Sequence, residues 1–566
     1  MSHRFNLSTW ALEHRTLTLF MLIVLTIAGT LSFFNLGRAE DPPFTIKQMV
    51  VSVAWPGATA REIEQQVTDK IETKLQELPY LYNVTSYSRP GEAVIFINLQ
   101  DSVPPKEVAG QWYQARKKIG DIRNTLPQGV LGPFFNDEFG DTYAVIWAFE
   151  GDGYSPAEMK ELIKKIRLRL LRVPDVAKAD IFGAQDERVY LEFSHVRLAT
   201  LGISVTQLFD ALQKQNAMTS AGMVETPSSR VALRIDAAPT TAAAIGEIPI
   251  NSGGRTLRIS DVAEVKRGYQ DPQTFSMRFM GKPALGLGLV MSSGGNMQAL
   301  GKLLDKEMAA IQGELPVGIT AHKVAFQPDV VDRSFSEFIY SLIEALGIVL
   351  AVSFVSLGLR SGIVVALCVP LVLAITFTAM EVMGINFHRI SLGALIIALG
   401  LLVDDAIIAV EMMMVKLEQG HTRMEAASYA YSSTAFPMLT GTLITAAGFV
   451  PVGFARSSAG EYTNAIFWVT AIALVVSWFV AVIFTPFIGY RLLPTPKPHA
   501  DGKHHDPYDR PLYRAFRRVV VWCLDHRWLV IGVTVATFLG SLFAFQFVQK
   551  QFFPTANRPE LIIDLR

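Results

Sequence analysis

Seven runs of apolar residues, each long enough to cross a lipid bilayer, dominate this sequence. They cover residues 17–34, 335–354, 362–383, 390–412, 436–454, 462–484 and 529–548. The composition agrees with this pattern, because 50% of the residues are hydrophobic and only 18% are charged. We therefore predict an integral membrane protein with about seven transmembrane helices.

Basic residues orient these helices, since Lys and Arg concentrate on the cytoplasmic side of a membrane. The arginines that decide the orientation are Arg4, Arg15, Arg360, Arg514, Arg517, Arg518 and Arg527. No cleavage site follows the first run, so we read residues 1–37 as the N-terminus and a retained first helix. Residues 331–490 would hold the second to sixth helices, and residues 529–550 the seventh. Residues 491–528 would form a cytoplasmic loop with an amphipathic helix on the membrane surface.

Two adjacent acids, Asp404 and Asp405, lie inside the apolar run 390–412. A carboxylate at the bilayer centre costs about 3 kcal/mol or more, so acids at this depth mark proton or ion pathways. No basic residue lies within reach along the same helix. The pair therefore predicts a site that loads and releases a proton.

Other classes of function find little support in the sequence. The glycine-rich stretch 281–295 lacks the Gly-Lys-Ser/Thr of a nucleotide-binding loop, which leaves an ion gradient, with H+ as the coupling ion, as the energy source. No nucleophile, base and orienting group occur together, so we do not expect an enzyme. Acidic and basic residues are equal in number, at 51 each, and favour no nucleic-acid partner. We expect neither a cofactor nor a metal site.

The stretch between the first two membrane helices contains a repeat. In each copy a strand leads to a capping box, formed by Thr59 with Glu62 and by Ser155 with Glu158, and a helix and two strands follow. This pattern predicts an external α+β domain of two ferredoxin-like (βαββ) subdomains. The first subdomain would cover residues 38–133, and the second would cover residues 134–182 and 274–330. Residues 183–273 would form an insertion within the second subdomain.

One membrane helix, a large repeated external domain and six further helices with Gly-Leu-Leu-Val-Asp-Asp-Ala in the fourth closely resemble the first half of a resistance-nodulation-division (RND) permease. The double aspartate is most similar to the hydrophobe/amphiphile multidrug efflux branch, since the heavy-metal branch typically has Asp-Gly at this point. The resemblance implies that Asp404 and Asp405 form the proton relay. It gives supporting roles to Glu344 and Glu411.

The same resemblance makes Phe182 a pocket aromatic, although a buried core phenylalanine is an equal alternative. Tyr143 and Trp147 are weaker pocket candidates. The implied activity is drug/proton antiport of amphiphilic small molecules, with the large domain in the periplasm of a Gram-negative cell and the helices in its inner membrane. The insertion would be a docking part through which a homotrimer meets a periplasmic adaptor protein and an outer-membrane channel.

We expect the chain to lack a C-terminal half. The predicted membrane acids have no Lys or Arg in any span, and in the family a lysine of the second half is their partner. Residues 551–566 read as the truncated start of a further external segment. Two other classes stay open: an RND-type lipid or hydrophobic-molecule transporter, and a non-transporting secretion auxiliary, whose external domain is usually smaller than residues 38–333.

Overall fold

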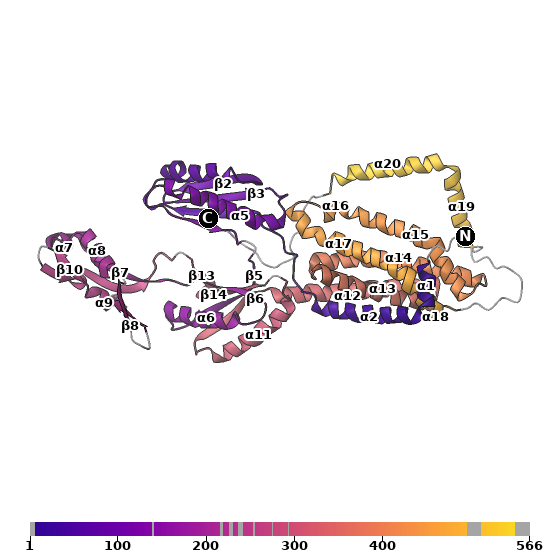
Figure 1. Ribbon diagram of the computed structural model, residues 1–566, viewed down its shortest axis with the longest axis horizontal. Coiled ribbons are helices and arrows are strands. Elements are labelled where there is room, and N and C mark those ends of the chain that lie inside the picture. Colours follow the sequence, from indigo (N-terminus) through magenta and orange to yellow (C-terminus); the bar gives the residue numbers. More distant parts are fainter. Residues whose placement is uncertain are drawn as a thin grey trace.

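The computed structural model describes residues 6–138, 141–215, 219–225, 230–235, 241–252, 255–273, 275–292, 294–494 and 511–548. The expected terminal segment 551–566 and part of the expected cytoplasmic loop lie outside these residues. Along the longest axis, Figure 1 shows a bundle of helices, then two subdomains with β-sheets, then a smaller unit at the far tip.

Most helices of the bundle are long and share one hydrophobic core. Its helices are α1 (Leu7–Glu13), α2 (Arg15–Asn35), α12 (Gln327–Leu357), α13 (Leu359–Met383), α14 (Arg389–Glu418), α15 (Arg423–Gly448), α16 (Val450–Gly453) and α17 (Ser458–Phe479), which continues through the π-helical turn η3 (Val480–Phe484) into α18 (Thr485–Leu492). Within the described residues, six helices are long and apolar enough to cross a membrane. They are Arg15–Asn35, Gln327–Val355, Leu359–Met383, Arg389–Glu418, Ser458–Leu492 and Arg527–Phe545.

The helix α15 differs from the expected fifth span, 436–454. It begins at Arg423, directly after a capping box of Thr422 and Glu425, and it ends at Gly448. Hydroxyl side chains along α15, such as Thr440 and Thr445, bond to backbone carbonyls of the preceding turn. This polar content keeps α15 out of the six spans, so the number of seven transmembrane helices stays a prediction.

Two helices at the end of the described chain lie at the edge of the bundle. The amphipathic helix expected in the cytoplasmic loop is α19 (Pro511–Asp525). It leads into α20 (Arg527–Phe545), which buries none of its residues against the rest of the described chain. In Figure 1, α20 runs along the outside of the bundle.

The first subdomain has the connectivity β-α-β-β-α-β. Its elements are β1 (Gln48–Ala54), the helix α3–η1–α4 (Ala60–Ile63, Glu64–Thr68, Asp69–Leu75), β2 (Leu81–Arg89), β3 (Glu92–Leu99), α5 (Pro105–Asp121), the 3-10 turn η2 (Arg123–Thr125) and β4 (Leu131–Asn136). The strands are ordered β2-β3-β1-β4. The predicted capping box of Thr59 and Glu62 is confirmed at the start of α3.

The second subdomain repeats this arrangement. Its elements are β5 (Tyr143–Gly151), α6 (Pro156–Leu170), β6 (Val176–Phe182), β13 (Met277–Phe279), β14 (Lys282–Met291), α11 (Met297–Glu314) and β15 (Ile319–Phe326). β14 lies between β5 and β6, and β15 flanks β5, which gives the order β6-β14-β5-β15. The capping box of Ser155 and Glu158 is confirmed as well. The predicted internal repeat is therefore present as two sheets with equivalent strand order.

The insertion leaves the second subdomain on a two-stranded ribbon, β7 (Glu187–Phe193) paired with β12 (Ala263–Tyr269). Beyond the ribbon lie α7 (His195–Thr200), α8 (Val205–Gln215), β8 (Thr219–Glu225), β9 (Arg230–Ile235), α9 (Ala242–Gly246), β10 (Pro249–Ser252), β11 (Arg255–Arg258) and α10 (Ile259–Val262). This unit has a small hydrophobic core of its own. It forms the tip at the end of the molecule away from the bundle (Figure 1).

Candidate functional site

The two aspartates of α14 have different surroundings. Asp405 is 7% exposed and faces α17, where the hydroxyl of Ser477 donates a hydrogen bond of 2.6 Å to its Oδ2 atom. The side chain of Thr442, on α15, also interacts with Asp405. Side chains from three helices therefore converge on one carboxyl group.

The backbone around Ser477 explains how the serine is held. The indole of the next residue, Trp478, donates a hydrogen bond of 2.8 Å to the carbonyl of Ala435, which ties α17 to α15. The π-helical turn η3 begins at Val480. Such turns inside α-helices are frequent at functional sites. Ser477 is thus followed first by a residue that anchors α17 to α15 and then by a departure from regular helix.

Asp404 and Glu411 are exposed on another face of α14, where the described residues do not cover them. They are seven positions apart, which places them on the same side of a helix. Glu344 is likewise exposed, on α12. Among the described residues, no Lys or Arg forms an ion pair with these three acids or with Asp405. The structure therefore brings Asp405 into the bundle and leaves the other three acids on its surface.

Reasoning from sequence missed Ser477 and Thr442. Each is a hydroxyl residue in a long helix of the bundle, and such residues often bond to the backbone of their own helix. Thr442 does so, through a bond of 2.9 Å to the carbonyl of Met438. Only the packing of the helices shows that both also meet Asp405.

The aromatic candidates Tyr143 and Phe182 meet on the second sheet. Their rings stack edge to face with centroids 4.9 Å apart, and the Tyr143 hydroxyl donates a 3.1 Å hydrogen bond to Asp180. Burial and this carboxylate raise the pKa of Tyr143. The rings cover Gly286 and Gly288 of β14, where a Cβ atom would come within 2.6 Å of them. The pair therefore forms a partly open aromatic surface.

Trp147 does not belong to this surface, which corrects its expected position in a pocket. It is 1% exposed and lies in the core of the second subdomain. Trp147 pairs with Leu287, whereas Phe182 pairs with Gly286, and successive residues of a strand point to opposite faces. A register shift between Leu289 and Val290 places Tyr143 on the face of Phe182 rather than on that of Trp147.

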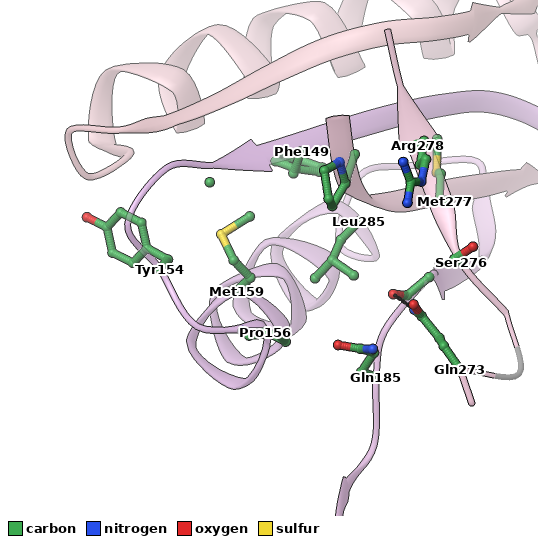
Figure 2. Close-up of a pocket in the computed structure, with 14 residues that line it drawn as sticks. Phe149, Tyr154, Pro156, Met159, Gln185, Gln273, Ser276, Met277, Arg278 and Leu285 are labelled. Carbon is green, nitrogen blue, oxygen red and sulfur yellow. Dashed lines mark hydrogen bonds between the residues drawn. The ribbon is translucent and has the colours of Figure 1, made fainter. Parts of the chain in front are cut away.

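A cavity of about 210 Å³ lies where the insertion joins the second subdomain. Figure 2 shows the residues that line the cavity. One side is mostly apolar and is formed by Phe149, Tyr154, Pro156, Met159 and Leu285. The other side is polar and is formed by Gln185, Gln273, Ser276 and Arg278. Its volume is below the roughly 300–1,000 Å³ of pockets for drug-sized ligands. Sequence reasoning did not identify this cavity, because its walls come from segments on both sides of the insertion.

Comparison with known proteins places this arrangement in a family. The profile of the AcrB/AcrD/AcrF family matches residues 7–566. The chain belongs to this family. Its similarity to multidrug proteins such as MdtC and AcrF also places it among the RND permeases, and its long apolar helices agree with that assignment.

Curated relatives of the chain are efflux proteins that are named for different cargoes. The chain is 26% identical over 515 residues to the cation efflux system protein CzcA of Alcaligenes sp. (strain CT14), covering 86% of this chain and 48% of the relative. It is 26% identical over 558 residues to the multidrug resistance protein MdtC of Pantoea ananatis (96% and 53%). It is 24% identical over 575 residues to the toluene efflux pump membrane transporter TtgE of Pseudomonas putida (96% and 54%).

The chain thus spans about half the length of the curated relatives it matches. The similarity to CzcA equals that to MdtC, so identity alone does not select a branch of the permeases. In the described part of the chain, no group of three or more His, Cys, Asp or Glu side chains lies close enough to hold a metal ion.

Proposed function

We propose that this chain is the first half of a proton-driven efflux permease that exports amphiphilic small molecules. The observation that carries the proposal is Asp405, a carboxyl group buried among membrane helices and hydrogen-bonded to Ser477 of a different helix. A group in this position can alternate between a charged and a neutral state, and the packing of two helices depends on which state it is in.

Asp405 would couple proton binding to helix movement through this hydrogen bond. When Asp405 is ionised, the Ser477 hydroxyl donates to a full negative charge, and such bonds are about twice as strong as neutral ones. When Asp405 is protonated, the link between α14 and α17 weakens. Proton loading and release would therefore switch α14 and α17 between two relative arrangements. Asp404, Glu344 and Glu411, on the uncovered surface, would meet the second half of the permease.

The subdomains would carry the substrate. Tyr143 and Phe182 offer an aromatic surface, and the cavity at the root of the insertion has room for part of an amphiphile. We further propose that both subdomains are ferredoxin-like and face the periplasm, and that the insertion lets a homotrimer meet an adaptor protein and an outer-membrane channel. The permease would lie in the bacterial inner membrane.

The test is dye efflux by the protein expressed from its natural gene in everted membrane vesicles. Asp405→Asn should abolish efflux driven by a proton gradient, because an amide cannot load a proton. Glu381→Gln is the matched control, since Glu381 is also an acid in a membrane helix but lies exposed near the end of α13. Full efflux by the Asp405→Asn variant at equal expression would refute the proposal.

Efflux of cations is the second candidate. It is favoured by the similarity to CzcA proteins, one of which, from Cupriavidus metallidurans, is named a cobalt-zinc-cadmium resistance protein. The same vesicles distinguish the two, when loaded in turn with a fluorescent dye and with cobalt, zinc or cadmium ions. We expect proton-dependent movement of the dye and none of the ions.

A further inference from the structure

Residues 37–47, which we call the strap, join the first membrane helix α2 to strand β1. The strap crosses the end of the bundle that faces the subdomains. Its contacts include the starts of α14 and α17, the helices that carry Asp405 and Ser477. The strap is therefore placed between the proposed proton site and the subdomains.

The strap binds the start of α14 through both backbone and side chains. The amide of Ala39 donates to the carbonyl of Phe387, and the amide of Phe387 donates to Gly37, both at 2.9 Å. The carboxylate of Glu40 is fully buried, accepts a 2.9 Å hydrogen bond from Gln327 of α12 and lies 3.2 Å from the guanidinium of Arg389. Any shift of the start of α14 must move this part of the strap or break these bonds.

The strap binds the start of α17 through Glu461 and Tyr462. The Lys47 ammonium lies 2.7 Å from one oxygen of Glu461, and the amide of Thr45 donates a 2.9 Å hydrogen bond to the other. The side chains of Lys47 and Glu461 are only 6% and 16% exposed. The Tyr462 hydroxyl donates to Asp41 at 2.7 Å. A buried ion pair with both carboxylate oxygens occupied is a specific contact rather than a loose surface pair.

The same residues reach the subdomains. Lys47 donates a second bond, 2.6 Å long, to the backbone carbonyl of Asp101, which follows β3 of the first subdomain. Asp101 in turn accepts bonds of 2.9 Å and 2.6 Å from the amide and hydroxyl of Ser458, at the start of α17. On the other side, the carbonyl of Arg38 accepts a 2.8 Å bond from Met297, the first residue of α11 in the second subdomain.

We propose that the strap is the positioning element that transmits a change in the Asp405–Ser477 contact to the first subdomain, with the Lys47–Glu461 ion pair as its central link. Glu461 lies about 24 Å along α17 from Ser477, and Arg389 lies about 24 Å along α14 from Asp405. A helix conveys a shift over this length because its backbone bonds keep it stiff. The proposal rests on the proposed proton-driven function, and the test separates the two.

The first measurement is amide hydrogen exchange in the membrane-embedded protein. Asp405→Asn mimics a permanently neutral carboxyl and should change the exchange of residues 37–47 and of the first subdomain by at least about fivefold, since exchange reports local opening. Lys47→Met keeps the length of the side chain but removes its charge. In this background, Asp405→Asn should still alter the exchange of α17 but should change that of the first subdomain much less, because only the direct contact of Ser458 with Asp101 remains.

The second measurement is proton-driven efflux. Lys47→Met should lower the rate of efflux about tenfold at equal expression. The charge-swapped double variant, Lys47→Glu with Glu461→Lys, should restore part of this rate, because the pair regains opposite charges. Lys118→Met is the matched control, since it removes a 2.8 Å ion pair with Glu77 that lies on the surface of the same subdomain. This control should transport normally.

The outcomes are distinct. If Asp405→Asn leaves the exchange of residues 37–47 unchanged, the strap proposal is wrong, whatever the transport result. If the exchange responds as expected but the wild-type protein moves no dye with a proton gradient, the strap stands as a conformational link and the proposed function fails. If Lys47→Met transports like the wild type and the exchange response of the first subdomain is undiminished, the ion pair has no coupling role.

Discussion

Asp404 and Asp405 are neighbours in sequence but not in environment. One residue of an α-helix turns the side chain by about 100°, so only one of the two can face α17. Asp405 takes that position and receives the hydroxyl of Ser477. The chemistry of the pair therefore depends on a partner 72 residues away, which no local pattern specifies.

Ser477→Ala removes the hydrogen bond to Asp405. A hydrogen bond to a charged group contributes about 1.5–3 kcal/mol, so we expect the rate of proton-driven efflux to fall by about tenfold or more. Ser477→Thr keeps a hydroxyl and should retain much of the rate. Thr440→Ala is the control, because that hydroxyl bonds to the carbonyl of Phe436 in its own helix and lies on an exposed face of α15. Equal rates for Ser477→Ala and Thr440→Ala would contradict the assigned role.

Gly288→Ala should displace the aromatic pair on the second sheet. The added Cβ atom would come within 2.6 Å of both Phe182 and Tyr143, and such overpacking costs about 1–3 kcal/mol. We expect a lower midpoint of thermal unfolding. In contrast, Gly110→Ala places a methyl group in open space on α5 and should stabilise that helix by about 0.5–1 kcal/mol. A Gly288→Ala protein as stable as the wild type would show that the rings do not cover this glycine.

At the scale of elements, local signals located the ends of helices well where a cap was present. The capping boxes of Thr59 with Glu62 and of Ser155 with Glu158 act within one turn, so the sequence contains the whole motif. The apolar run of the expected fifth span begins at residue 436, whereas the helix α15 begins at residue 423, because hydropathy follows apolar residues and the first turns of α15 are polar. The capping box of Thr422 and Glu425 was the signal that could have placed it.

The contact between Asp101 and Ser458 should depend on pH. Hydrogen bonds from the Ser458 hydroxyl and amide hold the pKa of Asp101 below its usual range. A carboxyl with a lowered pKa in the folded state stabilises that state above its ordinary pKa of about 3.9, and this stabilisation is lost as the pH falls through the lowered value. Asp101→Asn should therefore unfold at a lower temperature than the wild type near neutral pH.

The difference in unfolding temperature should shrink as the pH is lowered from neutrality toward the lowered pKa of Asp101, where the wild type loses the same charge. Thermal unfolding of both proteins in the same detergent across this range measures it. A difference that stays constant with pH would mean that the Asp101 side chain stabilises the folded protein through its packing and not through its charge.

At the scale of the whole molecule, the insertion behaves as a separate unit. Its ends meet on neighbouring strands, with Glu187 paired to Tyr269, and the amide of Gln270 donates a 2.9 Å bond to Asp186. Paired strands lie about 5 Å apart, so a short turn can close the gap that a deletion leaves. The unit also has a core of its own.

Replacing residues 188–268 with a two-residue turn should leave the rest of the protein folded and remove its self-association. We expect an unchanged midpoint of thermal unfolding and the loss of a trimer, measured by native mass in detergent. The full-length chain is the control. A deletion variant that unfolds at a much lower temperature would show that the insertion stabilises the second subdomain, and one that still forms the trimer would place the contacts between copies elsewhere.

The sequence by itself determined the features that depend on neighbouring residues. Apolar length indicates helices that can span a membrane, and repeated capping boxes with alternating strands indicate two equivalent subdomains. Two acids in an apolar run indicate a membrane site. These signals are local because hydrophobic burial, helix capping and the cost of a buried charge act on each segment wherever it packs.

Only the tertiary structure decided which side chains meet. The contact of Asp405 with Ser477, the separation of Trp147 from Tyr143 by a register shift, and the path of the strap across α14 and α17 all join residues far apart in the chain. The direction of a side chain depends on the rotation of a helix or the register of a strand. A shift of one residue turns a side chain by about 100° in a helix and to the opposite face in a strand, and only the packing of the whole chain settles its direction.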